Sequence, residues 1–278
     1  MTLYKNIKFF MLLFYALCFT VHAQHSVQKA KNDENVRQEK QCHLKPHKAE
    51  YTISLLEQTE NIRNVKGTVT IRILDSFGWT LEYHVKLQIF YDDGTQDNYE
   101  STLASFETYD HQSYRFTLKT ALNSEDISIT RGKAVIDEDN ATVIYKTPSN
   151  NSVDIDENSL FPIHLMKTLL KNAQEKPTTN TCNFFGYYNT EFMPLRMNTV
   201  MCAKEPSINV KGGTDIDFKK SYQMTVAIYP MHDTEVMDPI STLSKVIQAN
   251  GITVSESLFF PEFGFTIKTQ LSKLELYK

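Results

Sequence analysis

Apolar and polar side chains alternate without a break in the stretch Trp79-Thr80-Leu81-Glu82-Tyr83-His84-Val85-Lys86-Leu87-Gln88-Ile89. Successive side chains of a β-strand point to opposite faces of a sheet, so this period of two predicts a strand with one face on a core and the other in water. Asp93-Gly94 follows, and this dipeptide is typical of a hairpin turn. The stretch therefore predicts part of an antiparallel sheet that is wetted on one side.

The same alternation recurs outward from this stretch. Further strand-like segments lie at residues 51–55, 69–73, 103–109, 114–118, 127–136, 141–145, 222–228, 252–254 and 265–271. About ten strands with hairpin-length connections predict one antiparallel sheet that bends or closes on itself. No internal repeat and no long Gly/Ser or Pro linker follows residue 47. We therefore expect residues 47–278 to form a single, mainly β domain.

One segment has helical spacing instead. Pro162 stands in its first turn, and Ser159 is a candidate N-cap. Its apolar residues recur three and four positions apart: Ile163, Met166, Leu169, Leu170 and Ala173. We expect a helix near 162–174 whose apolar stripe is buried on the concave face of the sheet.

The N-terminus predicts export. Lys5 and Lys8 precede an apolar run at residues 9–21, and the run ends in Val21-His22-Ala23. A basic start, a short apolar core and a small-residue exit are typical of a secretory signal peptide, here residues 1–23. The run is shorter than a membrane span, which needs about 20 residues. Cys18 does not make a lipoprotein signal, because Leu17 stands where a small residue is required.

Composition bounds the mature chain. Residues 24–46 are mostly polar and predict a disordered tail. Removing the leader, which has two lysines and no acid, takes the formal net charge from −4 to −6. A mildly acidic surface gives no electrostatic reason to bind nucleic acid or anionic lipid headgroups. The aromatic content of 12% suits a strand-rich core.

Three cysteines remain in the mature chain: Cys42, Cys182 and Cys202. In an oxidising compartment, Cys182 and Cys202 form a candidate disulfide that would staple a hairpin and contribute about 3 kcal/mol. Spacing alone does not place their Cα atoms within bonding range, so the reduced state stays open. Cys42 is left over in the tail.

No catalytic, cofactor-binding or metal residues are predicted. Cys42, His43 and His47 offer three zinc ligands without a fourth. The acidic run Asp137-Glu138-Asp139 lacks the glycine and the closing glutamate of a calcium loop. His164 has no nucleophile that the sequence pairs with it, so we expect it to hydrogen-bond a nearby strand.

Short motifs follow one another in order from residue 47 to the C-terminus. They are His47-Lys48-Ala49-Glu50-Tyr51, Gly78-Trp79-Thr80, Asp93-Gly94, Ser105-Phe106-Glu107, Tyr114-Arg115-Phe116, Gly132-Lys133-Ala134, Tyr145 with Pro148, Leu160-Phe161-Pro162-Ile163-His164 and Leu271-Ser272-Lys273-Leu274-Glu275. This series resembles the EipB family, periplasmic cell-envelope integrity proteins of alphaproteobacteria. The resemblance implies a spiral, strongly bent sheet, half-barrel-like and similar in shape to periplasmic lipoprotein carriers. It also implies a role in maintaining the envelope without enzymatic activity.

The sequence departs from the family at one feature. Members carry a cysteine two residues before the Gly-Trp motif, bonded to another near the C-terminus. Here the first position is Ser76, and the chain ends Glu275-Leu276-Tyr277-Lys278. We therefore expect the family's disulfide to be absent and folding to depend less on oxidation than in the relatives.

The sequence leads to three hypotheses about function. We expect a non-enzymatic periplasmic protein that maintains envelope integrity through contacts with a protein or another envelope component. The alternative is a carrier of a lipid or acyl-chain ligand in the concave face of the sheet, which predicts a large apolar cavity. An envelope hydrolase would instead need a cleft with a nucleophile and a base. No cofactor is expected.

Overall fold

The computed structural model describes residues 43–57, 61–137, 140–174, 177–188, 191–204, 220–231, 238–260 and 265–277. The predicted signal peptide (residues 1–23) lies outside the described residues, as does the predicted tail up to residue 42. The last residues of that predicted tail are packed. Leu44 is buried, and the Lys45 N–H donates a hydrogen bond of 3.0 Å to the Asn250 carbonyl oxygen. The prediction of disorder up to Pro46 is therefore wrong for residues 44–46.

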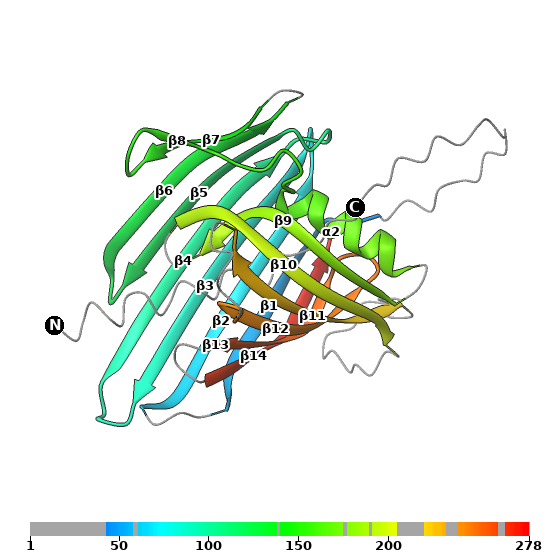
Figure 1. Ribbon diagram of the computed structural model, residues 1–278. Coiled ribbons are helices and arrows are strands. Elements are labelled where there is room, and N and C mark those ends of the chain that lie inside the picture. The colour runs from blue at the N-terminus through cyan, green and yellow to red at the C-terminus, as the bar shows by residue number, and fades with distance from the viewer. Residues whose placement is uncertain are drawn as a thin grey trace, which may run out of the picture.

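The described residues form one antiparallel sheet of fourteen strands (Figure 1). The strands are β1 (His47–Glu57), β2 (Ile62–Asp75), β3 (Trp79–Tyr91), β4 (Gln96–Glu107), β5 (Ser113–Leu122), β6 (Glu125–Ile136), β7 (Ala141–Thr147), β8 (Asn151–Asp154), β9 (Thr178–Tyr188), β10 (Glu191–Lys204), β11 (Ser221–Pro230), β12 (Ser241–Gln248), β13 (Thr253–Phe260) and β14 (Phe265–Leu276). Their order across the sheet is β8-β7-β6-β5-β4-β3-β2-β1-β14-β13-β12-β11-β10-β9. The prediction of a mainly β fold with one bent antiparallel sheet is confirmed.

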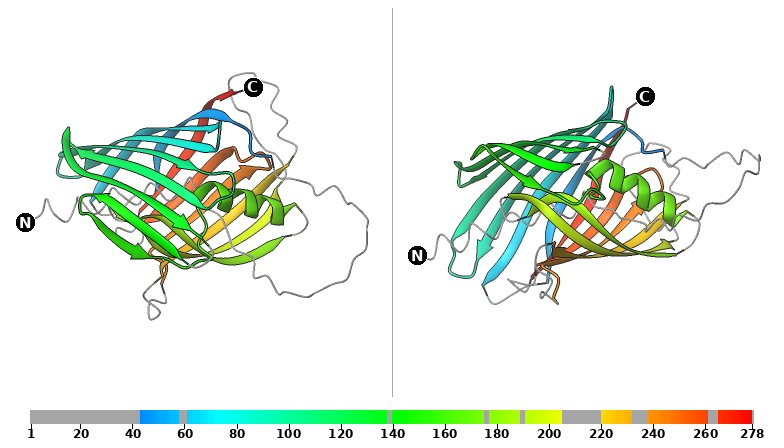
Figure 2. Two further views of the ribbon diagram at one scale, coloured as in Figure 1. Left: turned by 90° about the horizontal axis from the view of Figure 1, so that it is seen from above. Right: turned by 45° about the horizontal axis from the view of Figure 1, so that its top comes forward.

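β1 and β14, the first and last strands in the sequence, are neighbours in the sheet. β1 pairs with β2 on one side and with β14 on the other, so the two groups of strands that flank the helix in sequence join into one sheet. Seen from above, the sheet curls around its helix (Figure 2). The alternating stretch at residues 79–89 is β3, and its apolar residues face the inside of this curl.

The single helix of the described residues is α2 (Pro162–Ala173), on the inner side of the sheet (Figure 2). Pro162 stands in its first turn, as predicted, but Phe161 occupies the N-cap position. Ser159 is therefore not the cap, and its buried hydroxyl has no hydrogen-bond partner in the described part of the chain. The buried residues of α2 are Ile163, Leu165, Met166, Leu169, Leu170 and Ala173. No helix among the described residues has both the length and the hydropathy of a membrane span.

The two ends of the sheet approach each other without forming a continuous ladder. Leu160, just before α2, makes an isolated parallel bridge to Phe184 on β9, and the Tyr145 hydroxyl on β7 donates a hydrogen bond to the Phe192 carbonyl oxygen on β10. Aromatic rings fill the space between these ends: Tyr114, Phe116, Phe161, Phe185 and Phe192. The burial of these rings stabilises the curled shape of the sheet, because each ring removes a large apolar surface from water.

Candidate functional site at the start of helix α2

Glu107, the last residue of β4, caps the start of α2. Its side chain is 1% exposed. Its carboxylate accepts hydrogen bonds from the N–H groups of Ile163, at 2.8 Å, and His164, at 2.7 Å. The first N–H groups of a helix lack partners within the helix, and its N-terminus carries a partial positive charge. A carboxylate from a distant strand therefore replaces the local cap that the sequence suggested.

His111 extends this cluster from the turn between β4 and β5. Its Nδ1 lies 2.6 Å from a Glu107 carboxylate oxygen, and its backbone has a φ of 59°. Its ring stacks on the ring of His164, with centroids 4.1 Å apart and planes at 12°. The structure thus joins His164 to a strand, as predicted, through its backbone N–H and a partner histidine that the sequence did not indicate.

The next turn of α2 is held by Trp79. The Lys167 ammonium lies 4.5 Å from the centroid of the indole ring, a cation–π contact. Trp79 itself is buried, which agrees with its prediction as a packing residue. The start of α2 is therefore fixed by two strands, β3 and β4.

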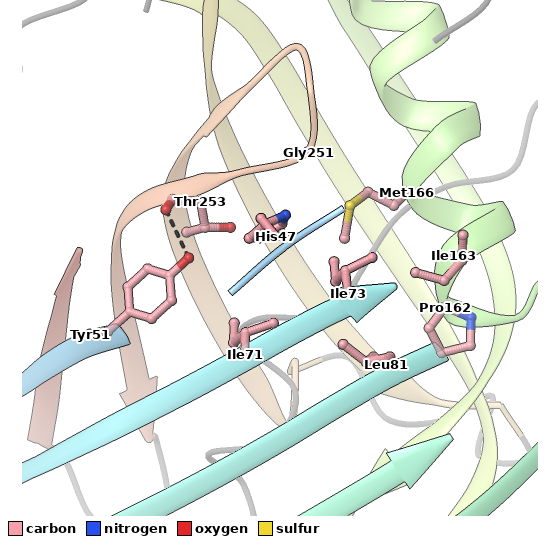
Figure 3. Close-up of a pocket in the computed structure, with 10 residues that line it drawn as sticks. All are labelled: His47, Tyr51, Ile71, Ile73, Leu81, Pro162, Ile163, Met166, Gly251 and Thr253. Atoms are coloured by element: carbon pink, nitrogen blue, oxygen red, sulfur yellow. Dashed lines mark hydrogen bonds between the residues drawn. The ribbon is translucent and has the colours of Figure 1, made fainter. Parts of the chain in front are cut away.

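A small cavity lies beside this cluster, between α2, β1 and the β12–β13 turn (Figure 3). Its volume is about 10 Å³, which is the space that one water molecule needs. Pro162, Ile163 and Met166 of α2 face it from one side, and the Tyr51 hydroxyl beside it donates a 2.9 Å hydrogen bond to the Thr253 carbonyl oxygen. Side chains thus fill the inner face of the sheet next to α2.

Glu107 and the two histidines are general acid–base groups in principle. In this structure the carboxylate accepts hydrogen bonds from two helix N–H groups and a histidine, which is the task of a cap. No group of three or more His, Cys, Asp or Glu side chains that could hold a metal ion is found in the described part of the chain. The arrangement is suited to fixing the helix on the sheet.

The candidate disulfide is not formed: Cys182 and Cys202 are not bonded to each other. Cys182 is buried on β9 opposite Met197, whereas Cys202 is exposed on β10 opposite Gln223 of β11. The two side chains lie on opposite faces of the sheet and several residues apart in register, which places them beyond disulfide geometry. Cys42 lies outside the described residues.

The sequence did not indicate Glu107 and His111 as a pair, although it held one signal for Glu107. Glu107 continues the inward-facing series Leu103 and Ser105 of β4. Carboxylates are rarely buried unless paired, so a glutamate at an inward position of a strand indicates a partner elsewhere in the chain. Which helix supplies that partner could not be read from the strand.

Comparisons with known proteins agree with this geometry. A family model described as EipB-like matches residues 38–278. The cell envelope integrity protein EipB of Brucella abortus (strain 2308) is 23% identical over 245 residues, covering 84% of this chain and 85% of that relative. The crystal structure of a beta-barrel-like protein of domain of unknown function DUF1849 from Brucella abortus matches with a TM-score of 0.77 and 21% identity. That match covers 85% of this chain and 99% of the other, and it confirms the bent-sheet fold.

Proposed function

Because this chain belongs to the EipB-like family, we propose that it is a non-enzymatic periplasmic protein that maintains cell-envelope integrity through contacts with proteins or other envelope components. The envelope role is supported by the similarity to a relative named as a cell envelope integrity protein. The periplasmic location is supported by the predicted leader at residues 1–23.

The observation that carries the contact role is the filled inner face of the sheet. Helix α2 buries six side chains there, and the cavity beside it has a volume of about 10 Å³. A site for an acyl chain needs about 300 Å³ or more. This packing counts against the carrier alternative and leaves the outer surface as the place for contacts.

The location and the role are tested by complementation. A deletion strain of the host is challenged with a membrane detergent and supplied with either the full chain or a chain that lacks residues 2–23. We expect rescue by the full chain alone, because only this form carries the export signal. Equal rescue by both chains would exclude a periplasmic site of action.

The contact role is separated from the carrier role by native mass spectrometry of protein purified from the periplasm. We expect the mass of the chain without a ligand, because α2 buries six side chains on the inner face and the cavity beside it has a volume of only about 10 Å³. A retained lipid-sized mass would contradict the contact role and favour the carrier.

A further inference from the structure

Two grooves lie next to each other on the outer face of the sheet, over β2 to β5. One has a volume of about 670 Å³ and is lined by Arg72, Glu82 and Thr102, among others. The second, of about 370 Å³, is lined by Gln88 and Asn98, among others. Both volumes fall in the range of ligand sites, roughly 300–1,000 Å³.

The two grooves occupy consecutive rows of the same face. His84, in the first groove, is opposite Thr102, and Lys86, two residues farther along β3, is opposite Glu100 in the second. Glu100 lies 2.7 Å from His84 Nε2 and 3.5 Å from Lys86 Nζ, so it spans the border. We treat both as one outer groove, formed by the residues of these two cavities.

Several residues that line the outer groove have short side chains, and we call these its floor. The floor residues are Thr70, Thr102 and Ala104 in the first cavity and Gly67, Thr68 and Ala121 in the second. Thr102 and Ala104 are exposed. Apart from Gly67, the floor residues occupy outward positions of β2, β4 and β5, where a solvated sheet would carry any polar residue.

Charge in the outer groove is balanced, because its lining holds three basic residues, Lys48, Arg72 and Lys86, and three acidic ones, Glu82, Glu100 and Glu275. Arg72 lies 3.2 Å from Glu82, and Glu100 accepts from both His84 and Lys86. A polyanion would meet Glu82 and Glu100, and a polycation would meet Arg72 and Lys86. Since like charges repel in either case, an uncharged ligand fits best.

The floor also restricts the kind of polymer. β2, β3, β4 and β5 each pair with a strand on both sides, so their backbone groups are used within the sheet. A peptide that adds as an extra strand needs a free sheet edge. Recognition here must come from side chains, such as the hydroxyl of Thr102 and the amides of Gln88 and Asn98, which hydrogen-bond each other at 3.1 Å.

These groups match the hydroxyls of a sugar. Hydroxyls and amides both donate and accept hydrogen bonds, as sugar hydroxyls do. Tyr277 lines one end of the outer groove, where its ring centroid is 5.8 Å from the Arg72 guanidinium carbon. An aromatic ring of this kind offers an apolar face for a sugar ring.

We propose that the outer groove binds an extended, uncharged glycan strand. The proposal rests on the periplasmic location proposed above, and it names the envelope component as a neutral, polyhydroxylated sugar chain. The ligand lies along β3, crosses the short residues of the floor and is bound through side chains on β2 to β5.

The test uses the purified mature chain, residues 24–278, and a hexamer of β-1,4-linked N-acetylglucosamine as the probe, followed by calorimetry. Cosedimentation with insoluble chitin, the uncharged polymer of the same sugar, is a second readout. The variant Thr102→Ile/Ala104→Ile fills the floor with residues that favour strands. The control Thr225→Ile makes the same change at an exposed position of β11.

We expect the mature chain to bind both probes, the filled variant to bind the hexamer about tenfold more weakly or worse, and the control to stay within about twofold. Circular dichroism checks that all three chains are folded. No binding by the unaltered chain, or equal binding by the filled variant, would overturn the proposal. Stronger binding of polyglutamate than of the hexamer would also overturn it, by favouring an acidic partner.

The outcome is separate from that of the proposed function. A chain that rescues the deletion strain but binds neither glycan probe keeps its envelope role and loses the glycan ligand. A filled variant that loses glycan binding and also fails to rescue would tie the outer groove to that role.

Discussion

Lys245 on β12 and Glu256 on β13 are directly opposite each other in the sheet, and both side chains are buried, at 1% and 2% exposure. The same row continues to Met224 on one side and to Thr269 on the other. The carboxylate oxygens of Glu256 have no hydrogen-bond partner among the described residues. Burial raises the pKa of Glu256 to about 8, and the nearby Lys245 lowers it only in part. The acid is therefore largely protonated at neutral pH.

Because of the raised pKa of Glu256, we predict that the protein loses stability as the pH rises. Because its pKa in the folded protein is raised, the folded chain keeps a proton that the unfolded chain has released above its ordinary pKa of 4.5. The folded state then binds more protons, so the free energy of unfolding falls as the pH rises toward 8. Urea unfolding at pH 5 and pH 8 measures this fall. Glu256→Gln should remove most of it, and equal falls in both chains would contradict the assignment.

We predict that removing Lys245 lowers the free energy of unfolding by an amount that depends on pH. Lys245→Met leaves a protonated Glu256 in an apolar site, so at pH 6 we expect a change within about 1 kcal/mol. At pH 9 the unaltered chain ionises Glu256 beside Lys245, which the variant cannot do, and we expect a loss that is about 1.4 kcal/mol larger than at pH 6, the free energy of one pKa unit. The control Lys268→Met removes an exposed lysine of β14 and should change little at either pH. A loss that is the same at pH 6 and pH 9 would contradict the pairing.

For His47 we predict the opposite trend, in which the protein loses stability as the pH falls. Burial lowers its pKa below the ordinary 6.5, and a hydrogen bond to the Lys45 carbonyl oxygen offsets this in part. The unfolded chain therefore binds a proton that the folded chain refuses, and the free energy of unfolding falls as the pH drops below 6.5. His47→Gln in the Glu256→Gln background isolates this slope. A slope that survives the substitution would assign it to another group.

An alanine substitution at Glu107 should destabilise the fold, because it removes the cap of α2. Glu107→Ala leaves two buried N–H groups of α2 without an acceptor, and we expect it to lower the free energy of unfolding by about 3 kcal/mol. Glu100→Ala, on the exposed face of the same strand, should cost under about 1 kcal/mol. Urea unfolding of both variants tests the difference. Equal costs would mean that the carboxylate does not serve as the helix cap.

We predict that a reducing agent does not change the thermal stability of the protein. In the variant Cys42→Ser, only Cys182 and Cys202 remain in the mature chain, and they are not bonded. We expect the Tm to change by under about 1 °C on reduction, since a disulfide of this loop length would contribute about 3 kcal/mol. Exposed Cys202 should react with a thiol reagent in the folded protein, and buried Cys182 only on unfolding. A marked drop in Tm would show that the bond forms in solution.

Much of the fold could be predicted from the sequence, but strands β8, β9, β10 and β12 were missed. The strict alternation of residues 79–89 marks β3, and the helical spacing after Pro162 marks α2. β12 was missed because Ser241 and Lys245 are polar residues at inward positions, which breaks the apolar period. A polar residue that is buried at an inward position, such as Lys245, has its partner on another strand, so the apolar period of its own strand does not mark it.

The candidate site was predictable only in part for the same reason. His164 stands out in the sequence, but its partners do not. The N–H groups of Ile163 and His164 meet a carboxylate that is 56 and 57 residues earlier in the chain. The outer groove likewise depends on floor residues that come from separate strands. A one-residue change of register would send each of these side chains to the other face.

The sequence by itself determined ten of the fourteen strands, the helix, and which side chains of the clearly alternating strands face inward. These are short-range properties, because backbone geometry repeats every two or 3.6 residues. Tertiary structure alone decided that β1 pairs with β14, that Glu107 caps α2 and that Lys245 faces Glu256. Such contacts depend on the order and curvature of fourteen strands, and no local period carries that information.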